Sequence, residues 1–325
     1  MIPGLIVLIL LLSLVLIKSA DMVIVAIRRL SRNTGTKTFV LSAIIIALGT
    51  SFPELFVGVT SALENSSSLS LGVVLGSNIA NIALIGGVTA FIVGKVGVHG
   101  DYLKHDVWIA LAAGIAPLVL ILDSQLSRVD GMVLVAIYLA YAAGFFRHRY
   151  VQIGREQKEE GFIYRFLRKF SHIDSHKTKE LGRLFVGVAL LLFSADVIVR
   201  LSTTLAGYAN IPLFLIGVVV LALGTSLPEF AFSLRSLEEH EPSMFFGNLL
   251  GSTIANSTLI IGLVSLIRPV KILAINEYVV AVLAFVIVFL TFWFFIRSKH
   301  RLDRWEAGVL LLLYFCFLFL EFTKT

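Results

Sequence analysis

The residues best suited to do chemistry are two glutamates, Glu54 and Glu229, that lie within long apolar segments. Each ends an eight-residue stretch that occurs twice, as ALGTSFPE at 47–54 and as ALGTSLPE at 222–229. A carboxylate at membrane depth is costly, and it therefore marks a candidate ion or substrate site. Because the two glutamates belong to an internal repeat, we predict one site built where the two copies meet.

Hydroxyl and amide side chains accompany each glutamate at helical spacing. Thr50 and Ser51 stand four and three residues before Glu54, so on a helix the three side chains lie on neighbouring parts of one face. On the following segment, Ser77 and Asn81 are also four residues apart. The second copy repeats this set at a constant offset of 175 residues, as Thr225, Ser226, Glu229, Ser252 and Asn256.

A proline stands directly before each glutamate and is expected to open the helix backbone. Proline removes one backbone hydrogen bond and clashes with the carbonyl four residues earlier. Pro53 is therefore expected to free the carbonyl of Gly49, and Pro228 that of Gly224. Opened backbone is tolerated at membrane depth where it lines a cavity, so we expect backbone carbonyls to join the side-chain oxygens.

All donors in this set are oxygens, which are the ligands of hard cations. Ca²⁺ takes about 6–8 oxygen ligands in flexible geometry, and Na⁺ accepts the same type, whereas softer metals prefer sulfur or imidazole. The single cysteine, Cys316, lies in an apolar run, and the seven histidines fall in predicted loops or helix ends. Two ionised glutamates would balance one Ca²⁺ ion or two Na⁺ ions, and an antiporter needs such an alternation.

Packing is a second interpretation for part of this set. The serines and asparagines could form interhelical hydrogen bonds rather than bind an ion. Asp21 and Asp196 are also related by the offset of 175, but they sit near helix ends and we interpret them as structural. Close helix packing explains four repeated glycines as well as a site does: Gly72, Gly76, Gly247 and Gly251.

Composition assigns the chain to an all-α polytopic membrane protein. Of its 325 residues, 58% are hydrophobic and only 15% are charged, whereas soluble domains have roughly 25% charged residues. A spanning helix needs about 20 residues, so ten or so spans use most of the chain. The net charge of +6 comes mainly from short loops beside apolar runs, so we read it as a topology signal and expect no nucleic-acid partner.

The apolar runs predict ten transmembrane helices in two five-helix repeats. The first five lie at about 2–26, 38–63, 70–93, 107–123 and 130–146, and the second five at about 181–203, 211–236, 243–267, 277–297 and 305–322. Because five is odd, the second copy must enter from the opposite side, and the repeats are predicted to be inverted. The predicted units are a first repeat at 1–146 with its motif at 47–82, a cytoplasmic linker at 147–180, and a second repeat at 181–325 with its motif at 222–257.

Basic residues predict which loops share a side of the membrane. They gather after the first span, in the segment 147–183 and after the ninth span, and all of these loops fall on one side. By the positive-inside rule that side is cytoplasmic and both termini lie outside. The loop at 237–242 should also be cytoplasmic, but it is acidic. This exception says little, because acidic residues contribute little to the rule. We interpret the linker as a connector, although its basic and aromatic run at 164–170 could also lie on an anionic membrane surface.

The duplicated stretches, together with GSNIANI at 76–82 and GSTIANS at 251–257, resemble the paired alpha-repeats of the sodium/calcium exchanger family in its compact prokaryotic form. The resemblance covers nearly the whole chain and implies alternating access, with the first and sixth spans sliding over a bundle. It implies a set of ion-binding residues in which Glu54, Glu229, Thr50 and Thr225 are the expected metal ligands. The other members supply hydroxyl, amide or backbone oxygens: Ala47, Ser51, Ser77, Asn81, Ala222, Ser226, Ser252 and Asn256.

The chain departs from the family pattern at Asn256, where some members carry an aspartate. The loss of a third carboxylate argues against K⁺ cotransport. The ratio of ions exchanged by the members with the aspartate therefore does not carry over to this chain. Val73 and Asn248, which occupy equivalent positions, also break the symmetry of the repeat. The two halves need not bind ions equally.

We predict an antiporter without a cofactor that exports Ca²⁺ in exchange for Na⁺ across the plasma or inner membrane. The alternative is Ca²⁺/H⁺ exchange, because the same two glutamates could carry protons. A cation channel usually builds its filter from rings of ligands, and a self-contained duplicated site disfavours it. An enzyme is not expected, since the sequence has no HExxH motif and no membrane histidine to activate Ser51 or Ser226.

Overall fold

The structure of the protein is a computed structural model. It describes residues 2–32, 50–97, 102–153, 175–238, 242–272, 275–299 and 301–323, nearly all of them helical. Ala47, Gly49 and the first part of the predicted span at 38–63, up to residue 49, lie outside the described residues, as does most of the predicted linker.

Helices form the whole frame of the molecule. The α-helices are α1 (Ile2–Arg32), α3 (Phe52–Leu63), α4 (Ser67–Ile79), α5 (Gly86–Val93), α6 (Tyr102–Leu120), α7 (Arg128–Ile153), α9 (Ser175–Ala209), α10 (Leu213–Leu215), α11 (Ala222–Thr225), α12 (Leu227–Glu238), α13 (Pro242–Ile254), α14 (Ile261–Ile267), α15 (Ile275–Lys299) and α16 (Arg304–Thr323). A 3₁₀ turn, η2 (Ile121–Asp123), extends α6. Three π-helical turns join consecutive α-helices: η1 (Ala80–Ile85), η4 (Ile216–Leu221) and η5 (Ala255–Ile260).

Six of these helical segments are long and apolar enough to cross a membrane. They are Ile2–Ala26, Ser67–Val93, Lys179–Ala209, Pro242–Ile267, Ile275–Ser298 and Arg304–Thr323. A seventh candidate consists of Leu213–Thr225 and Leu227–Glu238, which are bent by 40° at a break. The described residues therefore hold six or seven candidate spans, compared with the ten that the sequence predicts.

The bent segment differs from the predicted continuous helix at 211–236. The sequence predicts a proline kink there, but α11 ends at Thr225 and α12 starts at Leu227, with Ser226 in a turn between them. Pro228 thus occupies the second position of a new helix, where its missing N–H costs nothing. Each motif therefore starts a helix one residue before its proline, because α3 likewise begins at Phe52 with Pro53 second.

The internal repeat is visible in the helix boundaries themselves. The bounds of α12 are those of α3 shifted by 175 residues, and the bounds of η5 are those of η1 shifted by the same amount. Isolated π-helical turns are rare in proteins, and those that occur often lie at functional sites. Their recurrence at one offset shows that the two copies share local backbone geometry as well as sequence.

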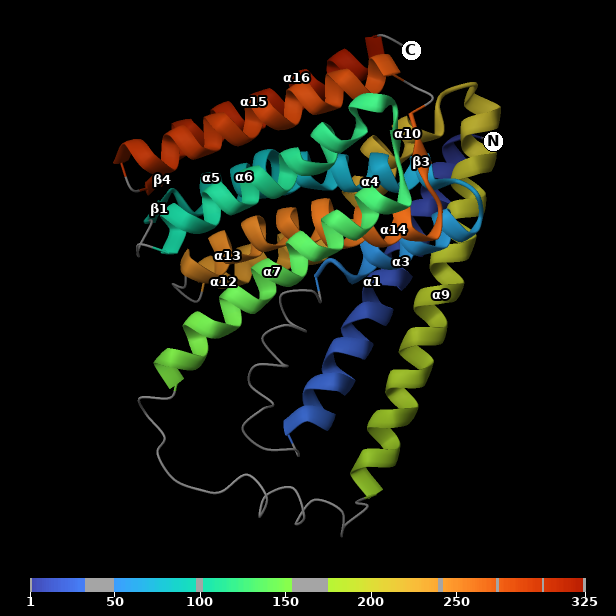
Figure 1. The fold of residues 1–325 in the computed structure, drawn as a ribbon, viewed down its shortest axis with the longest axis horizontal. Coiled ribbons are helices and arrows are strands. Elements are labelled where there is room, and N and C mark those ends of the chain that lie inside the picture. The colour runs from blue at the N-terminus through green and yellow to red at the C-terminus, as the bar shows by residue number, and fades with distance from the viewer. Residues whose placement is uncertain are drawn as a thin grey trace.

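Two helices, α1 and α9, pack side by side along one side of the molecule, away from α15 and α16 (Figure 1). They run in opposite directions, since the end of α1 lies near the start of α9. Apolar residues including Ile9, Leu16, Leu191 and Ile198 join this pair to each other and to α3, α4 and η4. A larger apolar cluster holds the remaining helices together, and α4 and η4 contribute residues to both clusters.

Short strands tie the loops together at the two ends of the bundle. The strand β1 (Lys95–Gly97) pairs with β4 (Arg301–Asp303), and β2 (Gln125–Leu126) pairs with β3 (Val270–Lys271), both antiparallel. Each pair joins loops that the sequence places on the same side of the membrane, and β1 and β3 lie at opposite ends in Figure 1. The arrangement agrees with the predicted alternation of loops.

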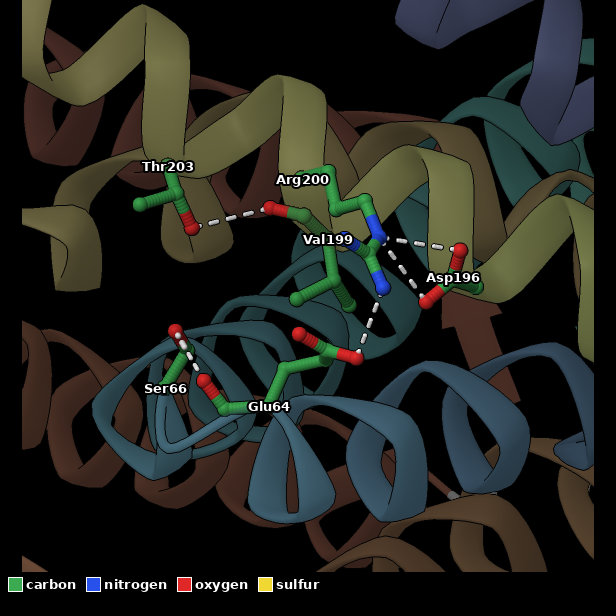
Figure 2. A network of polar contacts seen from close by, with 6 residues as sticks. All are labelled: Glu64, Ser66, Asp196, Val199, Arg200 and Thr203. Carbon is green, nitrogen blue, oxygen red and sulfur yellow. Dashed lines mark hydrogen bonds and ion pairs between the residues drawn. The ribbon is translucent and has the colours of Figure 1, made fainter.

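An ion-pair network connects α9 to the end of α3 (Figure 2). The Arg200 guanidinium lies 3.0 Å from the carboxylate of Asp196 on its own helix and 3.0 Å from that of Glu64, which follows α3. Asp196 thus has the structural role that the sequence suggests. Because all three side chains are partly exposed, we expect the network to contribute little to stability.

Candidate functional site

The predicted site residues meet in the interior of the bundle. Eleven of the twelve are described, and every one is buried. Glu54 lies on the first turn of α3, Ser77 on α4 and Thr225 at the end of α11. The Ser77 hydroxyl lies 3.4 Å from Glu54 Oε1, to which it donates, and 3.4 Å from Thr225 Oγ1. Ser77 thus links a carboxylate of the first copy to a hydroxyl of the second.

The same contact occurs a second time with the copies exchanged. Thr50 Oγ1 lies 3.5 Å from Ser252 Oγ. Thr50 is the repeat equivalent of Thr225, and Ser252 is the equivalent of Ser77. Reciprocal contacts of this kind are the mark of a two-fold interface. The geometry therefore brings both copies of the motif together around one buried centre, as the duplicated sequence predicts.

Several polar atoms at this centre have no hydrogen-bond partner among the described residues. Buried polar atoms are paired in the large majority of cases, so a cluster of unpaired oxygens is unusual. Such a cluster suits a cation that has lost its water, because each oxygen can replace part of the hydration shell. The unpaired atoms are Glu54 Oε2, both carboxylate oxygens of Glu229, the hydroxyls of Ser51 and Ser226, both amide atoms of Asn81, and Asn256 Oδ1.

A cation at this centre would depend mainly on neutral oxygens. In the part of the chain that the structure describes, no three histidine, cysteine, aspartate or glutamate side chains gather closely enough to hold a metal ion. Two carboxylates and the surrounding hydroxyl and amide groups are therefore the available donors. The carbonyl of Ala222 accepts a hydrogen bond from the Ser226 amide at 3.1 Å, so it would reach an ion only through its second lone pair.

One residue of the centre, Asn248 on α13, was not assigned a role from the sequence. Its side-chain oxygen accepts a hydrogen bond from Thr50 Oγ1 at 3.2 Å, and its nitrogen donates to the carbonyl of Glu229 at 3.3 Å and to Ser233 Oγ at 3.2 Å. Asn248 thus joins the two copies of the motif. The signal in the sequence was a polar residue one helical turn before Ser252, at a position where the first copy has valine.

A second missed residue, Asn78 on α4, lies between the two halves. Its side-chain nitrogen donates to Ser257 Oγ at 2.7 Å, and its oxygen accepts from Asn256 Nδ2 at 3.2 Å. All three side chains are at most 1% exposed. Asn256 sits in η5, and its equivalent Asn81 sits in η1, so each π-helical turn carries one amide of the predicted site.

Two of the four repeated glycines allow the helices of the two halves to touch. A Cβ atom added at Gly72 would lie 2.2 Å from the carbonyl oxygen of Phe214, and one at Gly76 would lie 2.4 Å from that of Val218. The packing interpretation is confirmed for these two. Around Gly247 and Gly251 nothing among the described residues lies within 4 Å of such an atom.

An apolar cavity of about 220 Å³ ends at the site. It lies between the η1–α5 segment and the α11–α12 break. Ser226 supplies the hydroxyl of its lining, and the other lining side chains are Ala80, Leu84, Ile85, Val88, Leu223, Leu227 and Phe230. The cavity reaches an unpaired oxygen of the centre.

The helical frame, the duplicated motif and the buried oxygen cluster define a membrane transport protein. A family model described as "Sodium/calcium exchanger protein" matches residues 4–147 and 179–323. The chain therefore belongs to the sodium/calcium exchanger family, as its motifs indicate.

Relatives align over nearly the full length of the chain. The inner membrane protein YrbG of Escherichia coli is 30% identical over 303 residues, which cover 92% of this chain and 90% of that protein. The sodium/calcium exchanger MaX1 of Methanosarcina acetivorans is 29% identical over 348 aligned positions, which cover 97% of this chain and 98% of that protein.

Solved structures of exchangers share the fold. A structure of the sodium-calcium exchanger NCX_Mj soaked with Na⁺ and Sr²⁺ is 26% identical, covers 98% of this chain and 99% of its own, and superposes with a TM-score of 0.61. The H⁺/Ca²⁺ exchanger CAX is 18% identical, covers 95% of this chain and 80% of its own, and superposes with a TM-score of 0.72. At that identity the second match speaks for the fold alone.

Proposed function

We propose that the protein exchanges Ca²⁺ for Na⁺ across the cell membrane. One observation carries the proposal: unpaired oxygens from both copies of the motif, including those of two fully buried glutamates, surround one centre. Two carboxylates can balance one divalent ion or two monovalent ions in turn. The relatives that bear the name sodium/calcium exchanger support the same choice of ions.

In this proposal Glu54 and Glu229 are the ligands shared by Ca²⁺ and Na⁺, and Thr50 and Thr225 bind the metal beside them. The remaining ligands are neutral oxygens that complete the coordination shell. They come from Ala47, Ser51, Ser77, Asn81, Ala222, Ser226, Ser252 and Asn256.

The proposed architecture has ten spans in two inverted five-helix repeats, at 1–146 and 181–325, joined by a cytoplasmic linker at 147–180. The opposite directions of the equivalent helices α1 and α9 support inversion, and so do the reciprocal Thr50–Ser252 and Ser77–Thr225 contacts. Alternating access would move the α1–α9 pair against the bundle, across the apolar contacts that the pair makes with α3, α4 and η4. Both termini would lie on the outer side of the membrane, opposite to the cytoplasm.

Ca²⁺/H⁺ exchange at the same site is a second candidate. Both oxygens of Glu229 are buried and unpaired among the described residues, and an ionised carboxylate in such surroundings is costly unless it is neutralised. A proton neutralises it as well as a metal ion does. The fold does not choose between the two coupling ions, because the H⁺/Ca²⁺ exchanger CAX shares it.

Uptake of ⁴⁵Ca²⁺ into proteoliposomes tests the proposal. Vesicles containing the full chain are loaded with Na⁺ and diluted into Na⁺-free buffer, while a parallel set carries only a pH gradient. We expect uptake that requires the outward Na⁺ gradient and persists when an ionophore collapses the pH gradient. Uptake driven by the pH gradient alone would replace Na⁺ by H⁺ as the coupling ion, and uptake in neither set would overturn both candidates.

A further inference from the structure

One hydrogen-bond chain at the centre is absent from the other copy of the repeat. Asn78 bridges Asn256 and Ser257 across the interface between the halves. Its own equivalent is Thr253, whose hydroxyl donates to the carbonyl of Leu249 on the same helix at 2.9 Å. The equivalent of Ser257 is Ile82, which cannot form such a bond. The chain of amides therefore breaks the two-fold symmetry in the middle of the site.

The chain fixes which end of the Asn256 amide is free. Asn256 Nδ2 donates to Asn78, whereas Asn256 Oδ1 is buried without a partner among the described residues. Only the oxygen end of an amide can bind a cation. By contrast, neither end of the Asn81 amide is held by a described residue, so that side chain must be oriented each time an ion binds.

We propose that Asn78 is a positioning residue that presents Asn256 Oδ1 to the transported cation. This inference rests on the proposed function, because it concerns the same ion site. Asn78 suits the role because it offers both an acceptor for Asn256 and a donor for Ser257, so its own amide is held at both ends. Without it, the Asn256 amide can turn its N–H groups toward the ion, and a donor repels a cation.

The expected consequence is a loss of affinity for Ca²⁺ rather than a loss of fold. Pre-organised ligands bind more tightly because less ordering is needed on binding. One hydrogen bond holds the ligand in place, so Asn78→Leu should raise the KM for Ca²⁺ by about fivefold. The kcat should change by less than about twofold. Ser257→Ala removes only the outer anchor, and its effect on the KM should be smaller.

A double-mutant cycle separates positioning from general packing. If Asn78 acts through Asn256, then Asn78→Leu should have no further effect on the KM in an Asn256→Ala background, because the ligand is already lost. Thr253→Ala is the matched control, since it is buried at the equivalent position and its hydroxyl bonds within its own helix. We expect this control to leave the KM unchanged.

The measurements are ⁴⁵Ca²⁺ uptake in proteoliposomes and the rise of the Tm on adding Ca²⁺ to the purified full-length protein. A smaller Ca²⁺-dependent rise in Asn78→Leu than in the unsubstituted protein, together with equal rises in Asn256→Ala and the double variant, supports the inference even where uptake is too slow to measure. Additive effects of the two substitutions, or an unchanged KM in Asn78→Leu, would overturn it. If that variant does not fold, an unchanged KM in Ser257→Ala overturns it instead. The proposed function is tested separately on the unsubstituted protein, and it fails if a Na⁺ gradient drives no Ca²⁺ uptake there.

Discussion

The centre of the protein contains one region that obeys the repeat and another that departs from it. In the symmetric region, threonine and serine hydroxyls from the two copies meet twice, at 3.4 and 3.5 Å. In the asymmetric region, Asn78 and Asn248 form hydrogen bonds that their equivalents, Thr253 and Val73, do not form. The comparison suggests that duplication supplied the paired carboxylates and hydroxyls. The positions at which the copies differ give each half its own hydrogen bonds.

The largest expected effect comes from breaking the symmetric region at its charges. Glu54→Gln and Glu229→Gln should each lower the rate of Ca²⁺ uptake by about 100-fold or more, because the loss of one carboxylate leaves a divalent ion half neutralised in a site of low dielectric. Uptake of ⁴⁵Ca²⁺ into proteoliposomes, driven by an outward Na⁺ gradient, measures this rate. The control is Glu238→Gln on the same helix as Glu229, which is exposed and should change uptake by less than about twofold.

If either glutamate variant kept near-normal uptake, the shared-ligand assignment would be wrong for that residue. Equal losses in both variants would extend the symmetry of the structure to function. A much larger loss for one would mean that the asymmetric region already divides the two halves into unequal roles.

Much of the symmetric region could be predicted from the sequence, and the asymmetric region could not. Apolar runs and the offset of 175 residues identify the helices and pair Thr50 with Thr225. The partners of Asn78 and Asn248, however, lie on helices that are remote in sequence, and their side chains meet only once the helices pack. The break at Ser226 was also missed, because a proline pattern is compatible with either a kink or a new helix start.

The glycines show the same limit. A repeated glycine can mark a site or a close contact, and the sequence left both interpretations open. The backbone of Phe214 and Val218 against Gly72 and Gly76 decides it for those two. Ala47, which was predicted as a ligand, lies outside the described residues, so its role stays a prediction.

An intermediate effect is expected from the serines, which sharpens the comparison within the symmetric region. Ser77 donates to the carboxylate of Glu54 and also approaches Thr225, whereas Ser252 approaches the neutral hydroxyl of Thr50. Hydrogen bonds to charged groups are worth about twice those between neutral groups. Ser77→Ala should therefore raise the KM for Ca²⁺ by about tenfold, and Ser252→Ala by about threefold.

Uptake measured over a range of Ca²⁺ concentrations gives both values. Ser236→Ala serves as a control, because that buried hydroxyl bonds the carbonyl of Phe232 within its own helix. A larger effect for Ser252 than for Ser77 would contradict the prediction that the Ser77 hydrogen bond to Glu54 matters more. Ser252, in the second copy, would then contribute more to Ca²⁺ binding.

The smallest effect is expected at Arg200, where the repeat is broken at the edge of the molecule. Its equivalent on α1 is Val25, so the ion pair that ties α9 to Glu64 has no counterpart in the other half. The pair is partly exposed, and its loss should lower the Tm only slightly. If α9 moves against the bundle during exchange, the pair must open, and Arg200→Gln should raise kcat by about twofold.

A double-mutant cycle of Arg200→Gln with Glu64→Gln isolates the contact, and Arg200→Lys keeps the charge without the planar fork. The coupling should shrink as the salt concentration rises, because exposed charges are screened. Tm and kcat are measured for the four proteins of the cycle at low and high salt. A change in Tm with an unchanged kcat would mean that α9 and α3 stay together throughout exchange, and the pair would then stabilise the fold without taking part in the cycle.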